Sequence, residues 1–153
     1  MLFLVRHADA GDKRAWVGPD GDRPLTGTGR RQAHGLVGQL DGDPITAIVT
    51  SPTLRCVQTV GPLARHRGLA VRTDAALHVD ADPDRALARL LAASPQRTVW
   101  CSHGELIGVL ITRLRELGAP IDPTAEWVKG STWRLEITDG KVLSAAYRPP
   151  AGA

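Results

Sequence analysis

Short apolar segments that alternate with longer amphipathic ones are the feature of this chain that most constrains its fold. The apolar segments at 2–5, 45–49 and 98–101 have the length and composition of buried strands. Between and after them, apolar residues recur every three to four positions, most clearly over 106–114, which indicates helices with one buried face. This alternation predicts a three-layer α/β/α sandwich with a mostly parallel central sheet.

Capping residues and turn signals set the other expected elements. Thr26 is typical of a helix N-cap, with Gly42 as the stop signal of that helix. Ser51 suits the N-cap of a second helix and Pro52 its first helical position. We also expect a loop at 8–24, a strand at 69–71, an acidic loop at 80–83 and a helix at 85–93.

The last part of the chain changes character. Residues 131–138 and 141–147 are strand-like and are joined through Asp139-Gly140, so a C-terminal antiparallel hairpin is expected. Residues 148–153 are expected to form a frayed tail. A length of 153 residues is enough for one domain with a proper core and too short for two ordinary ones, so we expect a single domain over 1–153.

Composition argues against several classes of protein. No apolar run approaches the roughly 20 residues that a membrane helix requires, and the apolar start is too short for an export signal, so a cytoplasmic location is expected. The net charge of +3 comes from scattered basic residues, and only 4% of residues are aromatic, which does not resemble a nucleic-acid-binding surface. Cys56 and Cys101 form no CxxC pair and are expected to be reduced core residues.

Cationic and imidazole side chains occur where apolar strands give way to the next segment. Arg6 and His7 end the first strand, Arg55 lies near the start of the helix after the second, and His103 follows the strand at 98–101. In an open α/β sheet such junctions converge on one crevice. Guanidinium groups match phosphate oxygens, and helix N-termini add N–H donors, so these junctions predict a phosphate pocket.

His7 is the candidate nucleophile for phosphoryl transfer. A neutral imidazole attacks phosphorus with one ring nitrogen while the other donates its proton to a backbone carbonyl, which holds the correct tautomer. Arg6 and Arg55 are expected to supply positive charge. We expect His103 to donate a hydrogen bond to the transferring phosphoryl group, cationic at least part of the time, and Gly104 to let backbone approach the ligand.

A leaving alkoxide needs a general acid, for which the sequence offers several carboxyl groups. Asp80, Asp82 and Asp84 lie close together, and Glu105 and Asp9 lie beside the two histidines. We favour Asp80 as the acid. A leaving group that is already good, such as an imidazole or a diphosphate, has less need of one.

Neither a metal nor a cofactor is expected. His34, His66 and His78 lack metal-ligand spacing with any other His, Cys or carboxylate. We expect His34 and His66 to be exposed helix residues and His78 to lie at the rim of the site. The glycines at 27–29 follow no strand directly and make a poor dinucleotide fingerprint.

Together these motifs resemble the histidine phosphatase superfamily, also called the phosphoglycerate mutase-like family. The resemblance runs from Leu2 to about Thr138. It is carried by Arg6-His7, Arg23-Pro24-Leu25-Thr26 with Gly29 and Gln32-Ala33, Ser51-Pro52 with Arg55 and Thr59, and Ser102-His103-Gly104. The resemblance implies a phosphohistidine intermediate on His7, independence of metal ions, and a pocket formed by Arg6, His7, Arg55 and His103.

Two branches of that family look closest. The start at 6–10 resembles the short phosphohistidine phosphatases, which act on phosphotransfer proteins, and the segments 23–25 and 129–133 resemble the phosphatase domain attached to some Nudix nucleotide hydrolases. The expected partner is therefore a phosphorylated small molecule, a nucleotide or a phosphohistidine protein, and neither a nucleic acid nor a membrane.

The sequence departs from the family pattern at two places. Ala8 stands where most members carry glycine, and the segment 77–80 offers Asp80 where the larger mutases have a glutamate. Mutase activity is therefore the least expected function. A phosphate-binding module that does not turn its ligand over is the alternative from another class, against which the intact pair of His7 and His103 argues.

Overall fold

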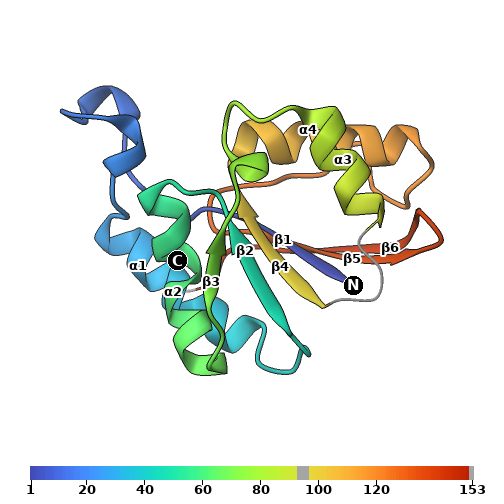
Figure 1. Ribbon diagram of the computed structural model, residues 1–153, viewed down its shortest axis with the longest axis horizontal. Coiled ribbons are helices and arrows are strands. Elements are labelled where there is room, and N and C mark those ends of the chain that lie inside the picture. Colours follow the sequence, from blue (N-terminus) through green and yellow to red (C-terminus); the bar gives the residue numbers. More distant parts are fainter. Residues whose placement is uncertain (93–96, 152–153) are drawn as a thin grey trace.

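A six-stranded sheet lies at the centre of the molecule in the computed structural model, which describes residues 1–92 and 97–151 (Figure 1). The strand order is β3-β2-β4-β1-β5-β6. The strands are β1 Leu2–Arg6, β2 Ala47–Thr50, β3 Val71–Thr73, β4 Thr98–Ser102, β5 Thr132–Thr138 and β6 Lys141–Arg148. The first four pair in parallel, and β5 and β6 add an antiparallel hairpin beside β1. The predicted fold class, with its C-terminal hairpin, is confirmed.

Helices cover both faces of this sheet. On one face lie α1 Gly27–Gln39 and α2 Leu54–Arg67, and on the other α3 Pro83–Ala92 and α4 Gly104–Glu116 (Figure 1). Short 3-10 helices occur in the loops: η1 Lys13–Ala15, η2 Asp20–Asp22 and η3 Ala75–Leu77. Within the described residues no helix is long and apolar enough to cross a membrane.

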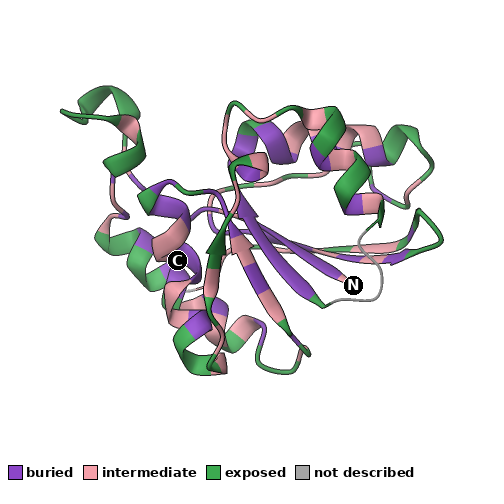
Figure 2. Ribbon diagram, viewed as in Figure 1, coloured by how far each residue is buried: buried purple, intermediate pink, exposed green. Residues whose placement is uncertain are grey.

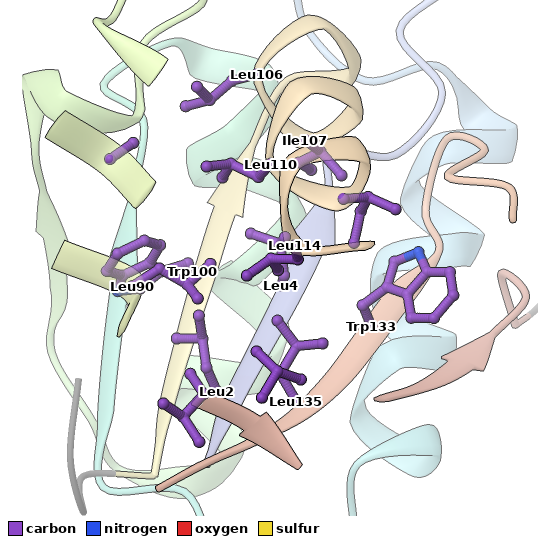
Figure 3. Close-up of a cluster of buried hydrophobic side chains, with 14 of the residues drawn as sticks. Leu2, Leu4, Leu90, Trp100, Leu106, Ile107, Leu110, Leu114, Trp133 and Leu135 are labelled. Atoms are coloured by element: carbon purple, nitrogen blue, oxygen red, sulfur yellow. The ribbon is translucent and has the colours of Figure 1, made fainter. Parts of the chain in front are cut away.

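The sheet divides the apolar interior into two cores, because successive side chains of a strand point to opposite faces. Leu2 and Leu4 of β1 pack with Trp100 beneath α3 and α4 (Figure 3). Phe3 and Val5 belong to the other core, with residues of α1 and α2. The strands at the centre of the sheet are buried along their length, as the burial colours of Figure 2 show, which explains why the segment 2–5 is apolar throughout.

Several predicted boundaries differ from the structure. The second helix starts at Leu54 with Thr53 as its N-cap residue, not at Ser51 and Pro52. The Ser51 hydroxyl instead contacts Nε2 of His103 and accepts from the N–H of Thr53, ahead of the helix. The third strand occupies 71–73 rather than 69–71, and α3 starts at 83, where a proline suits the first helical position. Ala93, the expected end of α3, lies outside the described residues.

The chain after β6 lies against α1, in contrast to the expected frayed tail. The side-chain amide of Gln39 donates to the carbonyl of Pro149 over 2.7 Å. Ala151 packs so closely on Gly35 that a Cβ at that glycine would lie 2.8 Å from the carbonyl oxygen of Ala151. Residues 152–153 lie outside the described part of the chain.

Candidate active site

The predicted pocket residues meet at the carboxyl ends of adjacent strands. β1 and β4 pair with Arg6 opposite Ser102, so His7 and His103 leave the sheet side by side, with ring centroids 5.5 Å apart. Arg55 comes from the first turn of α2, the helix that follows β2, and its Nη2 lies 3.3 Å from Nδ1 of His103. The topology thus brings together residues from chain segments far apart in the sequence.

His7 is held by main-chain groups on both sides. Its backbone N–H donates to the carbonyl of Ser102 over 3.0 Å, and its ring Nδ1 lies 2.8 Å from the carbonyl oxygen of Ala8. Since a carbonyl only accepts, Nδ1 carries the proton and Nε2 the lone pair. Burial lowers the pKa of His7 from 6.5 to about 4, so the ring is neutral at neutral pH. This is the arrangement expected of an attacking imidazole.

His103 has the opposite tautomer. Its Nε2 lies 2.8 Å from the Ser51 hydroxyl and its Nδ1 faces the guanidinium of Arg55. A guanidinium only donates, so Nδ1 accepts and Nε2 carries the proton toward Ser51. In this network Nδ1 of His103 is an acceptor, whereas the sequence led us to expect His103 to donate a hydrogen bond to the phosphoryl group. A proton on Nδ1 requires the contact with Arg55 to open.

Arg6 depends on the glycine after His103. One terminal nitrogen of Arg6 donates to the carbonyl of Trp127 over 3.0 Å. A Cβ at Gly104 would lie 2.7 Å from Cζ of Arg6, so only glycine leaves the guanidinium its place. Burial lowers the pKa of Arg6, while the charge of Glu105 opposes that shift.

Buried nitrogens without partners mark the pocket as a place for an anion. The Nε atoms of Arg6 and Arg55 have no hydrogen-bond partner among the described residues. Buried polar groups are nearly always hydrogen-bonded, so unpaired donors on two arginines of the site are consistent with binding of an anion there. Phosphate oxygens match guanidinium donors in charge and geometry.

The start of α1 supports the loop behind His7. The Thr26 hydroxyl donates to the Asp9 carboxylate over 2.6 Å and accepts from the N–H of Gly29 as the helix cap. The side-chain oxygen of Gln32 accepts from the N–H of Asp9. A Cβ at Gly29 would lie 2.0 Å from the Asp9 carbonyl oxygen, which explains glycine at that position.

The favoured acid, Asp80, lies beside His78 at the rim of the site. The Asp80 side chain is 88% exposed and has its carboxylate 3.8 Å from Nδ1 of His78. His78 is a rim residue, with its ring 5.9 Å from that of His103. Asp82 accepts from the N–H of Asp84, and Asp84 pairs with an arginine of α4. The assignment of Asp80 as general acid therefore stays a prediction.

One pocket residue escaped the sequence analysis. Asp20 of η2 places its carboxylate 3.0 Å from Nη2 of Arg55 and 3.2 Å from Nε of Arg23. The spacing of three between Asp20 and Arg23 is the one local signal for it, while its contact with Arg55 spans 35 residues. Among residues 1–92 and 97–151, no cluster of His, Cys, Asp and Glu side chains is arranged to hold a metal ion.

Comparison with known proteins identifies the class. Residues 2–78 match the family described as the histidine phosphatase superfamily (branch 1), and the chain belongs to this superfamily. The chain is also 35% identical over 154 residues to the 8-oxo-(d)GTP phosphatase of Mycolicibacterium smegmatis, covering 97% of this chain and 48% of that protein. It thus spans about half the length of that relative.

Solved structures show the same fold. The protein histidine phosphatase SixA complexed with tungstate superposes with a TM-score of 0.76 at 21% identity, covering 99% of this chain and 96% of that one. A mycobacterial glucosyl-3-phosphoglycerate phosphatase complexed with VO3 superposes with a TM-score of 0.65 at 18% identity, covering 99% of each chain. At these identities the likeness concerns the fold alone.

Proposed function

We propose that the protein is a metal-independent phosphatase that works through a phosphohistidine on His7. Nε2 of His7 attacks phosphorus, the bond from phosphorus to the leaving oxygen or nitrogen breaks, and the leaving group takes up a proton. Water then attacks phosphorus, the phosphorus–nitrogen bond breaks with its electron pair returning to Nε2, and inorganic phosphate leaves while the proton of the water passes to phosphate or solvent, which restores the neutral ring. Arg6 and Arg55 hold the phosphoryl oxygens during both steps, and His103 donates to them once its contact with Arg55 opens and Nδ1 takes up a proton.

The observation that carries this proposal is the protonation state of His7 beside unpaired guanidinium donors. The Ala8 carbonyl keeps the proton on Nδ1, and burial keeps the ring neutral, so Nε2 retains its lone pair. The unpaired Nε atoms of Arg6 and Arg55 supply donors for the charge that spreads over the phosphoryl oxygens. The proposed nucleophile and the guanidinium donors thus lie at the same edge of the sheet.

The position of the carboxyl groups favours substrates with good leaving groups. Asp80 is exposed and turned toward His78, so its carboxyl is poorly placed to protonate an alkoxide at the pocket. The leaving group of a nucleoside diphosphate or triphosphate is a phosphate ester, and that of a phosphohistidine protein is an imidazole. Both leave without strong acid assistance, whereas the alkoxide of a simple sugar phosphate does not. The 8-oxo-(d)GTP phosphatase relative supports the nucleotide, and a cytoplasmic location stays a prediction from the sequence.

A phosphate-release screen tests the proposed function. Sugar phosphates, nucleotides and a phosphohistidine protein are offered to the wild type and to His7→Ala, with the release of free phosphate as the readout. We expect release from the wild type alone, together with an acid-labile, alkali-stable label after incubation with a substrate carrying ³²P in the transferred phosphoryl group.

Two outcomes would contradict this function. Equal turnover by His7→Ala would exclude His7 as the nucleophile. Tight phosphopeptide binding by the wild type, with no phosphate released from any member of the panel, would favour the phosphate-binding module instead.

A further inference from the structure

Asp20 binds the two terminal nitrogens of the Arg55 guanidinium. Its main-chain carbonyl accepts from Nη1 over 2.9 Å, and its carboxylate accepts from Nη2 over 3.0 Å. Arg55 is only 3% exposed, so its terminal nitrogens have little contact with water and depend on such partners. A buried guanidinium held at two nitrogens has little freedom to rotate about its side-chain bonds.

The hydrogen bonds to Asp20 do not involve the third guanidinium nitrogen of Arg55, Nε. Both terminal nitrogens have acceptors, since Nη2 also faces Nδ1 of His103, whereas Nε has no partner among the described residues. Nε is therefore the guanidinium nitrogen of Arg55 that neither Asp20 nor His103 uses, and it is buried within the protein.

Asp20 also connects Arg55 to the loop behind the nucleophile. Its other carboxylate oxygen accepts from Nε of Arg23, whose terminal nitrogen donates to the carbonyl of Ala10 over 2.8 Å and to that of Gly11 over 3.2 Å. The chain from 10 to 11 follows directly on the nucleophile segment. One carboxylate thus joins two arginines that serve different parts of the site.

The charge state of Asp20 fits a holding role rather than proton donation. Partial burial raises its pKa, but the hydrogen bond from Arg23 and the charge of Arg55 outweigh burial and lower the pKa below its usual range. The carboxyl group is therefore ionised at neutral pH and has no proton to give to a leaving group.

We infer that Asp20 is a positioning residue for phosphoryl binding: it holds the terminal nitrogens of Arg55 and thereby keeps this guanidinium beside His103, where the proposed function needs a cation. This inference rests on the proposed phosphatase function and extends it to a residue of the loop before α1. Asp20 acts through Arg55 and need not touch the substrate.

Substitution of Asp20 tests the inference through binding and kinetics. Asp20→Ala is expected to weaken binding of inorganic phosphate, measured by titration calorimetry at pH 7, by about tenfold, as for the loss of one charge-assisted hydrogen bond. The KM for p-nitrophenyl phosphate is expected to rise by a similar factor, with a smaller change in kcat. Asp20→Asn keeps an oxygen acceptor for Arg55 and is expected to bind phosphate within about threefold of the wild type.

Asp22 provides the matched control. It lies in the same 3-10 helix and makes no salt bridge within the described residues, so Asp22→Ala is expected to leave phosphate binding unchanged. Asp20→Ala with wild-type phosphate affinity, or with tighter binding, would overturn the inference, even if its melting temperature fell. Asp20→Asn as weak as Asp20→Ala would overturn it too.

The binding readout separates this inference from the proposed function. If the wild type binds phosphate but turns over no substrate, the phosphatase proposal fails, while the affinities of the Asp20 variants still report on positioning. If the wild type turns over substrate and Asp20→Ala binds phosphate equally well, only the inference about Asp20 fails.

Discussion

At the scale of single residues, the partners of two histidines decide where each ring carries its proton. The Ala8 carbonyl can only accept, which places the proton of His7 on Nδ1. The Arg55 guanidinium can only donate, which places the proton of His103 on Nε2. Two neighbouring rings therefore differ in tautomer, and the lone pair on Nε2 of His7 meets no donor among the residues that the structure describes.

The titration of His7 is a prediction at this scale. Its ring should protonate with a midpoint of about 4, observed as the pH dependence of its Cε1–H signal in NMR spectra and assigned by the loss of that signal in His7→Ala. Because the unfolded ring takes up its proton near 6.5, the folded state binds fewer protons between these values. The contribution of the neutral His7 ring to the free energy of unfolding is therefore complete above pH 6.5. It falls by about 3 kcal/mol as the pH drops from 6.5 toward 4. A midpoint near 6.5 would contradict burial as the cause.

At the scale of elements, the N-terminus of α1 has two tasks. Its cap residue Thr26 satisfies the N–H of Gly29 and also binds the Asp9 carboxylate, so the helix start and the loop behind His7 are stabilised by one hydroxyl. Gln32 adds a bond to the Asp9 N–H one turn further along the helix. Helix formation and the placement of the nucleophile segment are thereby coupled.

Thr26→Ala tests this coupling. Loss of the cap is expected to lower the free energy of unfolding by about 1 kcal/mol in urea denaturation, and to weaken inorganic phosphate binding because Asp9 loses a partner. Thr26→Ser keeps the hydroxyl and should restore both. An unchanged phosphate affinity in Thr26→Ala would show that the loop keeps its position without the cap.

At the scale of the whole molecule, a carboxylate in the loop between α1 and β2 forms ion pairs with the C-terminal hairpin of β5 and β6. Asp43, between α1 and β2, lies 2.6 Å from Arg148 of β6 and 3.7 Å from Arg134 of β5. Its side chain is largely buried, with 14% exposed. The hairpin at the edge of the sheet is therefore anchored by charge as well as by strand pairing.

Asp43→Ala should destabilise the fold by about 2 kcal/mol, because it removes the carboxylate that Arg148 binds and leaves Arg134, among the described residues, only its contact with the more exposed Glu136. The measurement is the midpoint of urea denaturation. Asp41→Ala serves as the comparison, since the Asp41 side chain is 70% exposed and its carboxylate lies beside His66, a pair expected to contribute less than about 0.5 kcal/mol. Equal losses in the two variants would contradict the anchoring role of Asp43.

Much of the fold and of the pocket follows from local patterns. The segments 2–5 and 98–101 were recognisable as strands because buried strands are apolar on both faces, and α4 because its apolar residues share one face. The rule that parallel strand ends meet at one edge then brings His7, Arg55 and His103 together. The N-cap predicted at Ser51 was wrong, and residues 149 and 151 of the expected frayed tail contact α1.

The amino-acid sequence by itself determined the α/β class, the order of the elements and the candidate nucleophile, because hydrophobic periodicity and residue chemistry are local properties. The tertiary structure alone decided which distant groups share a hydrogen bond. Ser51 meets His103 across 52 residues and Asp20 meets Arg55 across 35, and no local pattern specifies either pair. Such contacts depend on where packing against the sheet places each loop, and they determine which ring nitrogen is protonated and which arginine nitrogen stays free.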